Sequence, residues 1–156
     1  MTTLIINKKR YDVELKGHET LLEVLRDQCG LTGTKTACEE SECGTCMVQI
    51  NGKAVLSCIT LACSLDGDAV VTIEGLADGD NLHPVQQAYI DTGAVQCGYC
   101  IPGMIISSKA LLDKNLEPTQ EEIEYALDGN LCRCAGYPKI VEAVKLAGEM
   151  MKHSKK

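Results

Sequence analysis

Hydrophobic residues in the first half of the chain occur in short runs separated by polar turns. Runs at 3–6 and 10–15 flank Asn7-Lys8-Lys9 and predict a β-hairpin. Runs at 47–50 and 53–57 flank Asn51-Gly52, the strongest short-range signal for a two-residue hairpin turn. Residues 69–74 (AVVTIE) have the composition of one more buried strand. The pattern therefore predicts a small mixed sheet before about residue 75.

One helix is predicted to cross this sheet. Thr20 and Glu23 have the spacing of a capping box, and Gly30 stands where a C-terminal cap belongs. A helical apolar stripe is formed by Leu21, Leu22, Val24 and Leu25. We expect about two helical turns between the two hairpins.

From residue 82 the hydrophobic period becomes that of helices. Helices are predicted at 84–91, 102–115, 119–127 and 138–151, and three of them open with a proline at the favoured first position. The polar stretch 78–81 (DGDN) is the natural linker. The predicted fold class is therefore α+β, with one domain at 1–77 and a helical, four-helix bundle-like domain at 82–156.

Charge and composition exclude several classes of protein. The chain has 15 basic and 22 acidic side chains, a formal charge of −7, and no Phe or Trp, so nucleic acid is not an expected partner. It has no apolar run of about 18 residues, and its first residues read as a strand and turn, not as a signal peptide. We expect no membrane span and a cytoplasmic location. Domains of this size bury a modest fraction of their surface and need further stabilisation.

The ten cysteines supply a candidate for that stabilisation. In a reducing compartment they are more often metal ligands than disulfides. Eight of them form two groups, which we name the first cysteine set, Cys38, Cys43, Cys46 and Cys58, and the second cysteine set, Cys97, Cys100, Cys132 and Cys134. Cys29 and Cys63 fall outside both sets and are expected to be buried small apolar residues. His18, His83 and His153 are isolated and expected to be structural or exposed.

The first cysteine set has the spacing of a plant-type ferredoxin, Cys-x4-Cys-x2-Cys with a distant fourth cysteine. Three thiolates converging on one cluster force the backbone to wrap around it, and Gly44 permits that wrap. The Asn51-Gly52 hairpin returns Cys58 to the neighbourhood of Cys46. Structural zinc is the alternative, but zinc sites favour two tight pairs of ligands. A disulfide is not favoured for these cysteines, because nothing in the sequence indicates export to an oxidising compartment.

The second cysteine set consists of two tight pairs separated by two predicted helices. Helices of similar length run out and back, so the second pair returns to the first. One helix is predicted to begin just after Cys100 and another just after Cys134, so that two positive helix ends would face the thiolates. This spacing also suits zinc.

The segments QCGYCIPGM (96–104) and GNLCRCAGY (129–137) resemble the signature segments of small iron–sulfur subunits of molybdenum hydroxylases, the relatives of xanthine dehydrogenase, aldehyde oxidoreductase and carbon monoxide dehydrogenase. The resemblance covers nearly the whole chain. It departs from the family at Ser41, where Gly is common, and at Ile101 and Ala135, where Thr is usual. All eight cysteines are present.

The resemblance implies an N-terminal β-grasp, ferredoxin-like domain and a C-terminal helical domain, each with one [2Fe–2S] cluster. The second cysteine set would hold the cluster beside a molybdopterin cofactor on a large subunit, and the first set the cluster nearer FAD on a medium subunit. Gln96 and Arg133 flank ligands and are candidates to contact the pterin or a partner. The chain would then act in a hetero-oligomer, with a dimer of heterotrimers as one arrangement.

The expected function is one-electron transfer within a multi-subunit oxidoreductase, without catalysis by this chain alone. Two alternatives remain open at this point. One is a free-standing two-cluster ferredoxin, and the other is a zinc-stabilised interaction module without a redox role.

Overall fold

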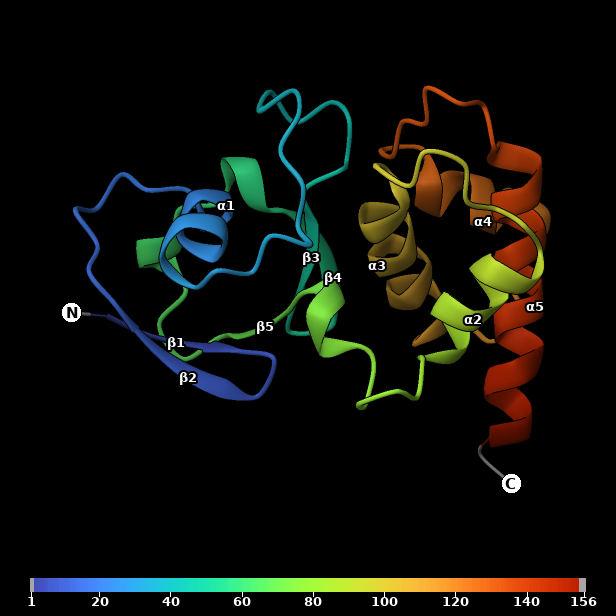
Figure 1. Cartoon of the computed structure of the whole chain (residues 1–156), viewed down its shortest axis with the longest axis horizontal. Coiled ribbons are helices and arrows are strands. Elements are labelled where there is room, and N and C mark those ends of the chain that lie inside the picture. Colours follow the sequence, from blue (N-terminus) through green and yellow to red (C-terminus); the bar gives the residue numbers. More distant parts are fainter. Residues whose placement is uncertain (1, 155–156) are drawn as a thin grey trace.

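The structure is a computed structural model that describes residues 2–154. Its first half is a five-stranded mixed sheet in the order β2-β1-β5-β3-β4 (Figure 1). The strands are β1 (Thr2–Ile6), β2 (Lys9–Val13), β3 (Met47–Ile50), β4 (Lys53–Leu56) and β5 (Ala69–Val71). Both predicted hairpins are confirmed, and β5 joins them by pairing parallel to β1 and antiparallel to β3.

The turn residues explain the hairpins. Asn7 and Lys8 both have positive φ, at 52° and 63°, and Asn51 and Gly52 have φ of 50° and 78°. Two successive positive φ values are those of a type I′ turn, whose twist matches the flanking strands. The local sequence therefore determines the register of each hairpin.

Strand β5 ends three residues earlier than predicted. The side chain of Asn7 accepts a hydrogen bond of 2.9 Å from the Thr72 amide and donates one of 2.9 Å to the Thr72 hydroxyl. These bonds take the place of strand pairing, and the chain turns into the short 3₁₀ helix η4 (Ile73–Gly75). A side chain from a distant turn thus ends the strand.

The predicted helix over the sheet is confirmed as α1 (Leu21–Glu23), which continues as the π-helical segment η1 (Val24–Gln28). Both bonds of the capping box between Thr20 and Glu23 are present. Gly30 has φ of +68°, and the next amide closes the helix end by donating to the Leu25 carbonyl. The core beneath this helix is formed by Leu4, Ile6, Val13, Leu21, Val24, Leu25, Val48, Ala62, Leu65 and Val70.

The second half is helical, as predicted. Its helices are α2 (Pro84–Asp91), α3 (Ile101–Leu112), α4 (Gln120–Leu127) and α5 (Tyr137–Ser154). Helix α5 is longer than predicted at both ends, and residues 155–156 lie outside the described residues. Nine of the twelve residues of α3 are buried, because this helix lies between β3 on one side and the other helices on the other (Figure 1). Helix α3 is therefore the element that joins the two halves.

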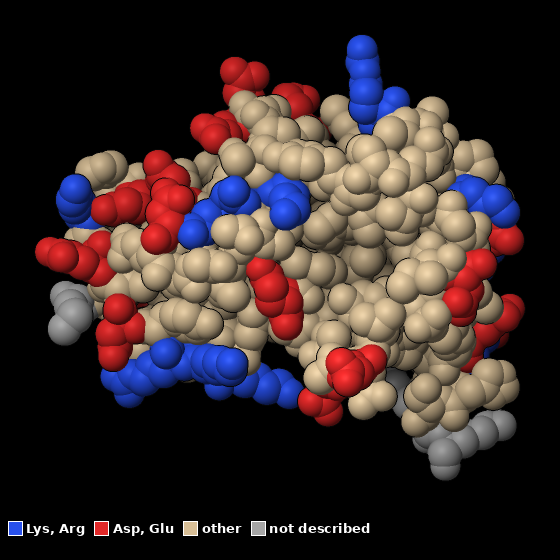
Figure 2. Space-filling model, viewed as in Figure 1, with Lys and Arg blue, Asp and Glu red and all other residues tan. Residues whose placement is uncertain are grey.

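The last element of the sheet half, η4, ends at Gly75, and α2 begins at Pro84. The domain boundary at 78–81 stays a prediction. Across the interface the buried side chain of Gln49 on β3 donates a hydrogen bond of 3.2 Å to Asp113 at the end of α3. Within residues 2–154, no helix is long and apolar enough to cross a membrane. Acidic and basic side chains are scattered over the visible face in Figure 2, with acidic groups gathered at its upper left.

Candidate metal centres

The first cysteine set lies in and beside the loop that precedes β3. Cys38 and Cys43 are in the loop, Cys46 immediately precedes β3, and Cys58 lies in the 3₁₀ helix η2 (Ser57–Ile59) that follows β4. The β3–β4 hairpin therefore returns Cys58 to the neighbourhood of Cys46, as predicted. The loop has positive φ at Glu39, Ser41 and Gly44, which makes the backbone wrap.

Backbone amides point at the sulfur of Cys38. The amides of Glu40 and Cys43 each donate to Cys38 Sγ at 3.4 Å. These hydrogen bonds, with a further one to the Cys43 side chain, lower the pKa of Cys38 to about 7. Because thiolates are the metal-binding form of cysteine, this loop favours the state that a metal needs.

The other two thiols of the first set are buried together. Cys46 and Cys58 form one small buried cluster with Leu22, and Leu56 packs against it. Burial raises the pKa of Cys46 to about 11. A buried thiolate needs a neighbouring positive charge, which metal ions supply.

The second cysteine set brings together two segments that are distant in sequence. Cys97 and Cys100 precede α3, whereas Cys132 and Cys134 lie between α4 and α5. The interactions are crossed, since the Cys97 thiol lies close enough to that of Cys134 to affect its pKa, and the Cys100 thiol does the same with that of Cys132. All four line one small cavity. The predicted return of the second pair to the first is confirmed.

Helix starts adjoin this set as predicted. Helix α3 begins directly after Cys100, and α5 begins three residues after Cys134. Burial acts to raise the pKa of Cys132. The amide of Gly136, which directly precedes α5, and further hydrogen bonds act in the opposite direction. Their combined effect is larger, so the pKa of this thiol is lowered. At Cys97 the amide of Tyr99 lowers the pKa, whereas burial raises that of Cys100 to about 12.

The segments that carry the two cysteine sets are hydrogen-bonded to each other. The amide of Leu131 donates a hydrogen bond of 2.9 Å to the carbonyl of Cys43. Thr45, the residue before Cys46, donates from its hydroxyl to the carbonyl of Tyr99, the residue before Cys100, at 3.2 Å. In both bonds one partner is a cysteine of the first set or the residue just before one. The other partner is the residue just before a cysteine of the second set.

The remaining candidates occupy different environments. Gln96 donates from Nε2 to the carbonyl of Cys134 at 3.3 Å, so it holds the backbone of the second set. Arg133 is exposed and makes no ion pair within residues 2–154. Cys29 is half-buried and Cys63 is exposed, so the expectation that both are buried is wrong. Cys63 lies on the short 3₁₀ helix η3 (Ala62–Ser64), where Ala62 takes the core position instead.

The histidines have the structural or exposed positions that we expected. His18 and His153 are exposed. His83 is half-buried and caps α2, where its Nδ1 accepts a hydrogen bond of 3.2 Å from the Val85 amide. Burial lowers the pKa of His83, and the nearby Lys109 adds to this effect. A neutral imidazole is the form that accepts this bond.

The donor sets fit [2Fe–2S] clusters. Each set provides four thiols, arranged as two contacting pairs, and a cluster of two irons takes two thiolates on each iron. Within residues 2–154, no three His, Cys, Asp or Glu side chains lie together as ligands of a single ion. Amides directed at Cys38, Cys97 and Cys132 match the negative charge of a thiolate-bound cluster.

Comparison with known proteins identifies both halves. The family described as "2Fe-2S iron-sulfur cluster binding domain" matches residues 4–77, and the one described as "[2Fe-2S] binding domain" matches residues 72–145. The nicotinate dehydrogenase small FeS subunit of Eubacterium barkeri is 47% identical, with 94% of this chain and 93% of the relative covered.

Solved structures agree with this assignment. Quinoline 2-oxidoreductase from Pseudomonas putida 86 matches with a TM-score of 0.93 and 34% identity over 99% of this chain and 97% of the matched chain. The aldehyde oxidoreductase from Desulfovibrio desulfuricans matches with a TM-score of 0.93 and 39% identity over 97% of this chain, but over only 17% of its own. The chain belongs to the family of iron–sulfur subunits of molybdenum hydroxylases, with an α+β fold and two [2Fe–2S]-binding domains that serve electron transfer.

Proposed function

We propose that this chain passes electrons one at a time from a molybdopterin centre on a large subunit, through two [2Fe–2S] clusters, toward FAD on another subunit. A [2Fe–2S] cluster accepts and releases single electrons. The observation that carries the proposal is the hydrogen bond between Cys43 and Leu131, which joins the two candidate cluster sites. The chain's own contribution is to hold the clusters, fix their separation and present them to partners.

We assign the first cluster to Cys38, Cys43, Cys46 and Cys58, and the second to Cys97, Cys100, Cys132 and Cys134. The paired thiols and the amides that face them support this assignment. Both family matches name iron–sulfur clusters, and neither supports the zinc alternative.

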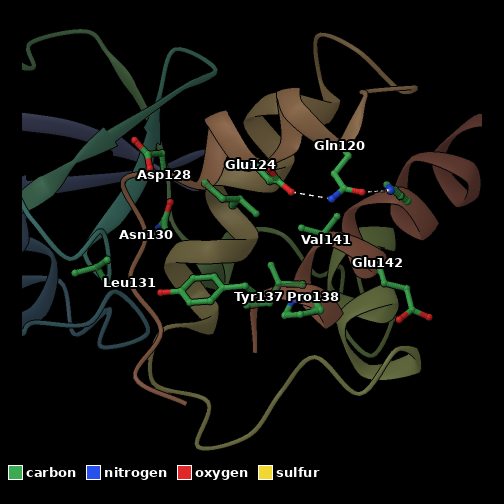
Figure 3. Close-up of a pocket in the computed structure, with 12 residues that line it drawn as sticks. Gln120, Glu124, Asp128, Asn130, Leu131, Tyr137, Pro138, Val141 and Glu142 are labelled. Carbon is green, nitrogen blue, oxygen red and sulfur yellow. Dashed lines mark hydrogen bonds between the residues drawn. The ribbon is translucent and has the colours of Figure 1, made fainter. Parts of the chain in front are cut away.

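The second cluster is proposed to face the large subunit. Cys97 is exposed, and exposed hydrophobic side chains surround this set, among them Val95, Tyr99 and Leu131 at 42%, 48% and 54% exposure. A groove on one side is lined by Ile90, Val95 and Ile101. A second groove, shown in Figure 3, lies between α4 and α5 and includes Leu131 and Tyr137. Apolar surface of this kind marks a protein interface.

Arg133 and Gln96 are assigned different roles in this proposal. Arg133 lies between two proposed ligands with its side chain exposed, a position that suits contact with the pterin or with the large subunit. Gln96 holds the Cys134 carbonyl, so we assign it to support of the second cluster as well as to the partner surface.

The first cluster is proposed to face the FAD-binding subunit. Its loop projects from the top of the molecule in Figure 1, and it carries the exposed carboxylates of Glu39, Glu40 and Glu42. A partner with a basic surface would complement this loop. Assembly as a hetero-oligomer and a cytoplasmic location belong to the same proposal, and ten cysteines without a disulfide in residues 2–154 are consistent with a reducing compartment.

Purification from the native source tests this function. We expect a coloured protein with two irons and two acid-labile sulfides per cluster, accompanied by a large molybdopterin-bearing subunit. Electron paramagnetic resonance of the reduced protein should show two distinct signals. A colourless, zinc-loaded protein would refute electron transfer, and a coloured chain that emerges alone would favour the free-standing ferredoxin.

Substrate recognition is proposed to lie outside this chain. Relatives in sequence or in structure are named for nicotinate, quinoline and aldehyde chemistry. The aldehyde oxidoreductase chain extends far beyond the part that this protein matches. The identity of the co-purifying large subunit would therefore establish the substrate class.

A further inference from the structure

One side chain contacts both the loop of the first cysteine set and the helix that begins at the second. Asn130 is 3% exposed and lies on the segment that follows α4 (Figure 3). Its Nδ2 donates a hydrogen bond of 3.1 Å to the carbonyl of Gly44, and its Oδ1 accepts one of 2.8 Å from the hydroxyl of Ser107 on α3. Both ends of this amide are therefore occupied.

The backbone segments around Asn130 approach one another closely at two glycines, Gly44 and Gly103. A Cβ atom at Gly44 would lie 2.1 Å from the Gly129 carbonyl and 2.7 Å from Asn130 Nδ2. A Cβ at Gly103 on α3 would lie 2.3 Å from the Gly44 carbonyl. The loop that holds Cys43 and Cys46 is thus packed, backbone against backbone, between α3 and the segment before Cys132.

We propose that Asn130 is a positioning residue that sets the separation of the two clusters and hence the rate of electron transfer between them. The proposal rests on the proposed function. Asn130 acts through the backbone, because it binds the Gly44 carbonyl, which directly follows the Cys43 carbonyl that accepts the Leu131 amide. Electron transfer depends steeply on distance, so a small shift of this loop alters the rate while each cluster keeps its own ligands.

Two substitutions separate the parts of this contact. Asn130→Ala removes both hydrogen bonds, whereas Asn130→Asp keeps the size and the acceptor for Ser107 but offers no donor to Gly44. Without the Asn130 donor the Gly44 carbonyl keeps the hydrogen bond of 3.2 Å from the Met47 amide, which lies in its own segment, but loses its side-chain tie to the segment after α4. The loop is then freer to move relative to that segment. Asn115→Ala is the matched control, since Asn115 lies in the turn after α3 and its side chain accepts the Glu117 amide, away from both sets.

The experiment uses the assembled holoenzyme with measured iron content. The magnetic interaction between the two reduced clusters is recorded by electron paramagnetic resonance, and intercluster transfer is timed after flash reduction. We expect both Asn130 variants to retain all iron, to show a changed magnetic interaction and to slow the transfer several-fold, while Asn115→Ala matches the parent. A structural role alone would lower stability without changing the interaction between loaded clusters.

The outcomes distinguish this proposal from the proposed function. If the parent lacks two iron–sulfur signals, the proposed function fails. If the parent has both signals and both Asn130 variants keep its magnetic interaction and transfer rate, the positioning role is refuted and the function stands. If Asn130→Ala loses iron, the magnetic interaction and the transfer rate are measured in Asn130→Asp and Ser107→Ala instead, because each of these variants retains one of the two contacts. Parent-like values in both would refute the positioning role.

Discussion

The backbone carbonyl of Cys43 and the backbone amide of Leu131 lie 2.9 Å apart across the interface between the two domains. Each belongs to a segment that carries candidate cluster ligands, and Leu131 directly precedes Cys132. The contact is made by main-chain atoms, so its geometry depends on how closely the two segments approach.

Loss of one thiol should affect one cluster. We expect Cys134→Ser to remove the second cluster and leave the first, because no thiol pair spans the two sets. Iron content should fall by half, and one of two paramagnetic signals should disappear. Cys63→Ser is the control, since Cys63 is exposed and outside both sets. Simultaneous loss of both signals would contradict independent sites.

Close approach of the two segments should require Gly44. Gly44 and Gly30 have nearly equal φ values, +67° and +68°, but only at Gly44 would a Cβ meet other atoms within 4 Å. Alanine at either position incurs about 1–2 kcal/mol for the left-handed conformation. We expect Gly44→Ala to lower the free energy of unfolding by about 1–3 kcal/mol more than Gly30→Ala, the usual cost of overpacking. Equal losses in urea denaturation would refute this contact.

Removal of iron should loosen the ligand segments more than the sheet. The loop of the first set has few backbone hydrogen bonds and three residues with positive φ, so bound iron would order it. We expect hydrogen exchange to accelerate at residues 36–46 and 131–136 after chelation, and less in β1 and β2. Uniform acceleration throughout the chain would show instead that iron stabilises the fold globally.

Acid should destabilise the protein through His83. In the unfolded chain this imidazole is protonated below about pH 6.5. In the folded protein burial lowers its pKa, so the unfolded state binds more protons and stability falls as the pH drops below that value. His83→Asn should keep the cap of α2 but remove this part of the pH dependence in urea titrations. Parallel pH profiles for parent and variant would assign the effect to other groups.

Features with local causes could be predicted from sequence. The two hairpin turns depend on Asn7 and Asn51-Gly52, and the capping box at Thr20 depends on a residue three positions away. The close spacing within Cys38-x4-Cys43-x2-Cys46 and within each pair of the second set is also local, and the helical hairpin between the two pairs predicted that they would meet. The first helix was predicted with its cap, but its π-helical second half has no signal in the pattern.

Features with long-range causes could not be predicted. The end of β5 depends on Asn7, which is 65 residues away from Thr72. The contact of Asn130 with Gly44 spans 86 residues, and nothing in a single sequence distinguishes this asparagine from one that ends a helix. The exposure of Cys63 depends on which face of a short 3₁₀ helix meets the core. These contacts become visible only when both domains are folded and packed.

The crossed pairing in the second cysteine set has a consequence for biosynthesis. Each of its contacts unites a thiol before α3 with one after α4, namely Cys97 with Cys134 and Cys100 with Cys132. The four thiols of this set can therefore come together only after both helices have been synthesised and have folded back on each other. The first set differs, because Cys38 and Cys43 are near neighbours in one loop. The geometry of the second set is thus complete only once the helical hairpin has closed, whereas half of the first set is present within a single loop.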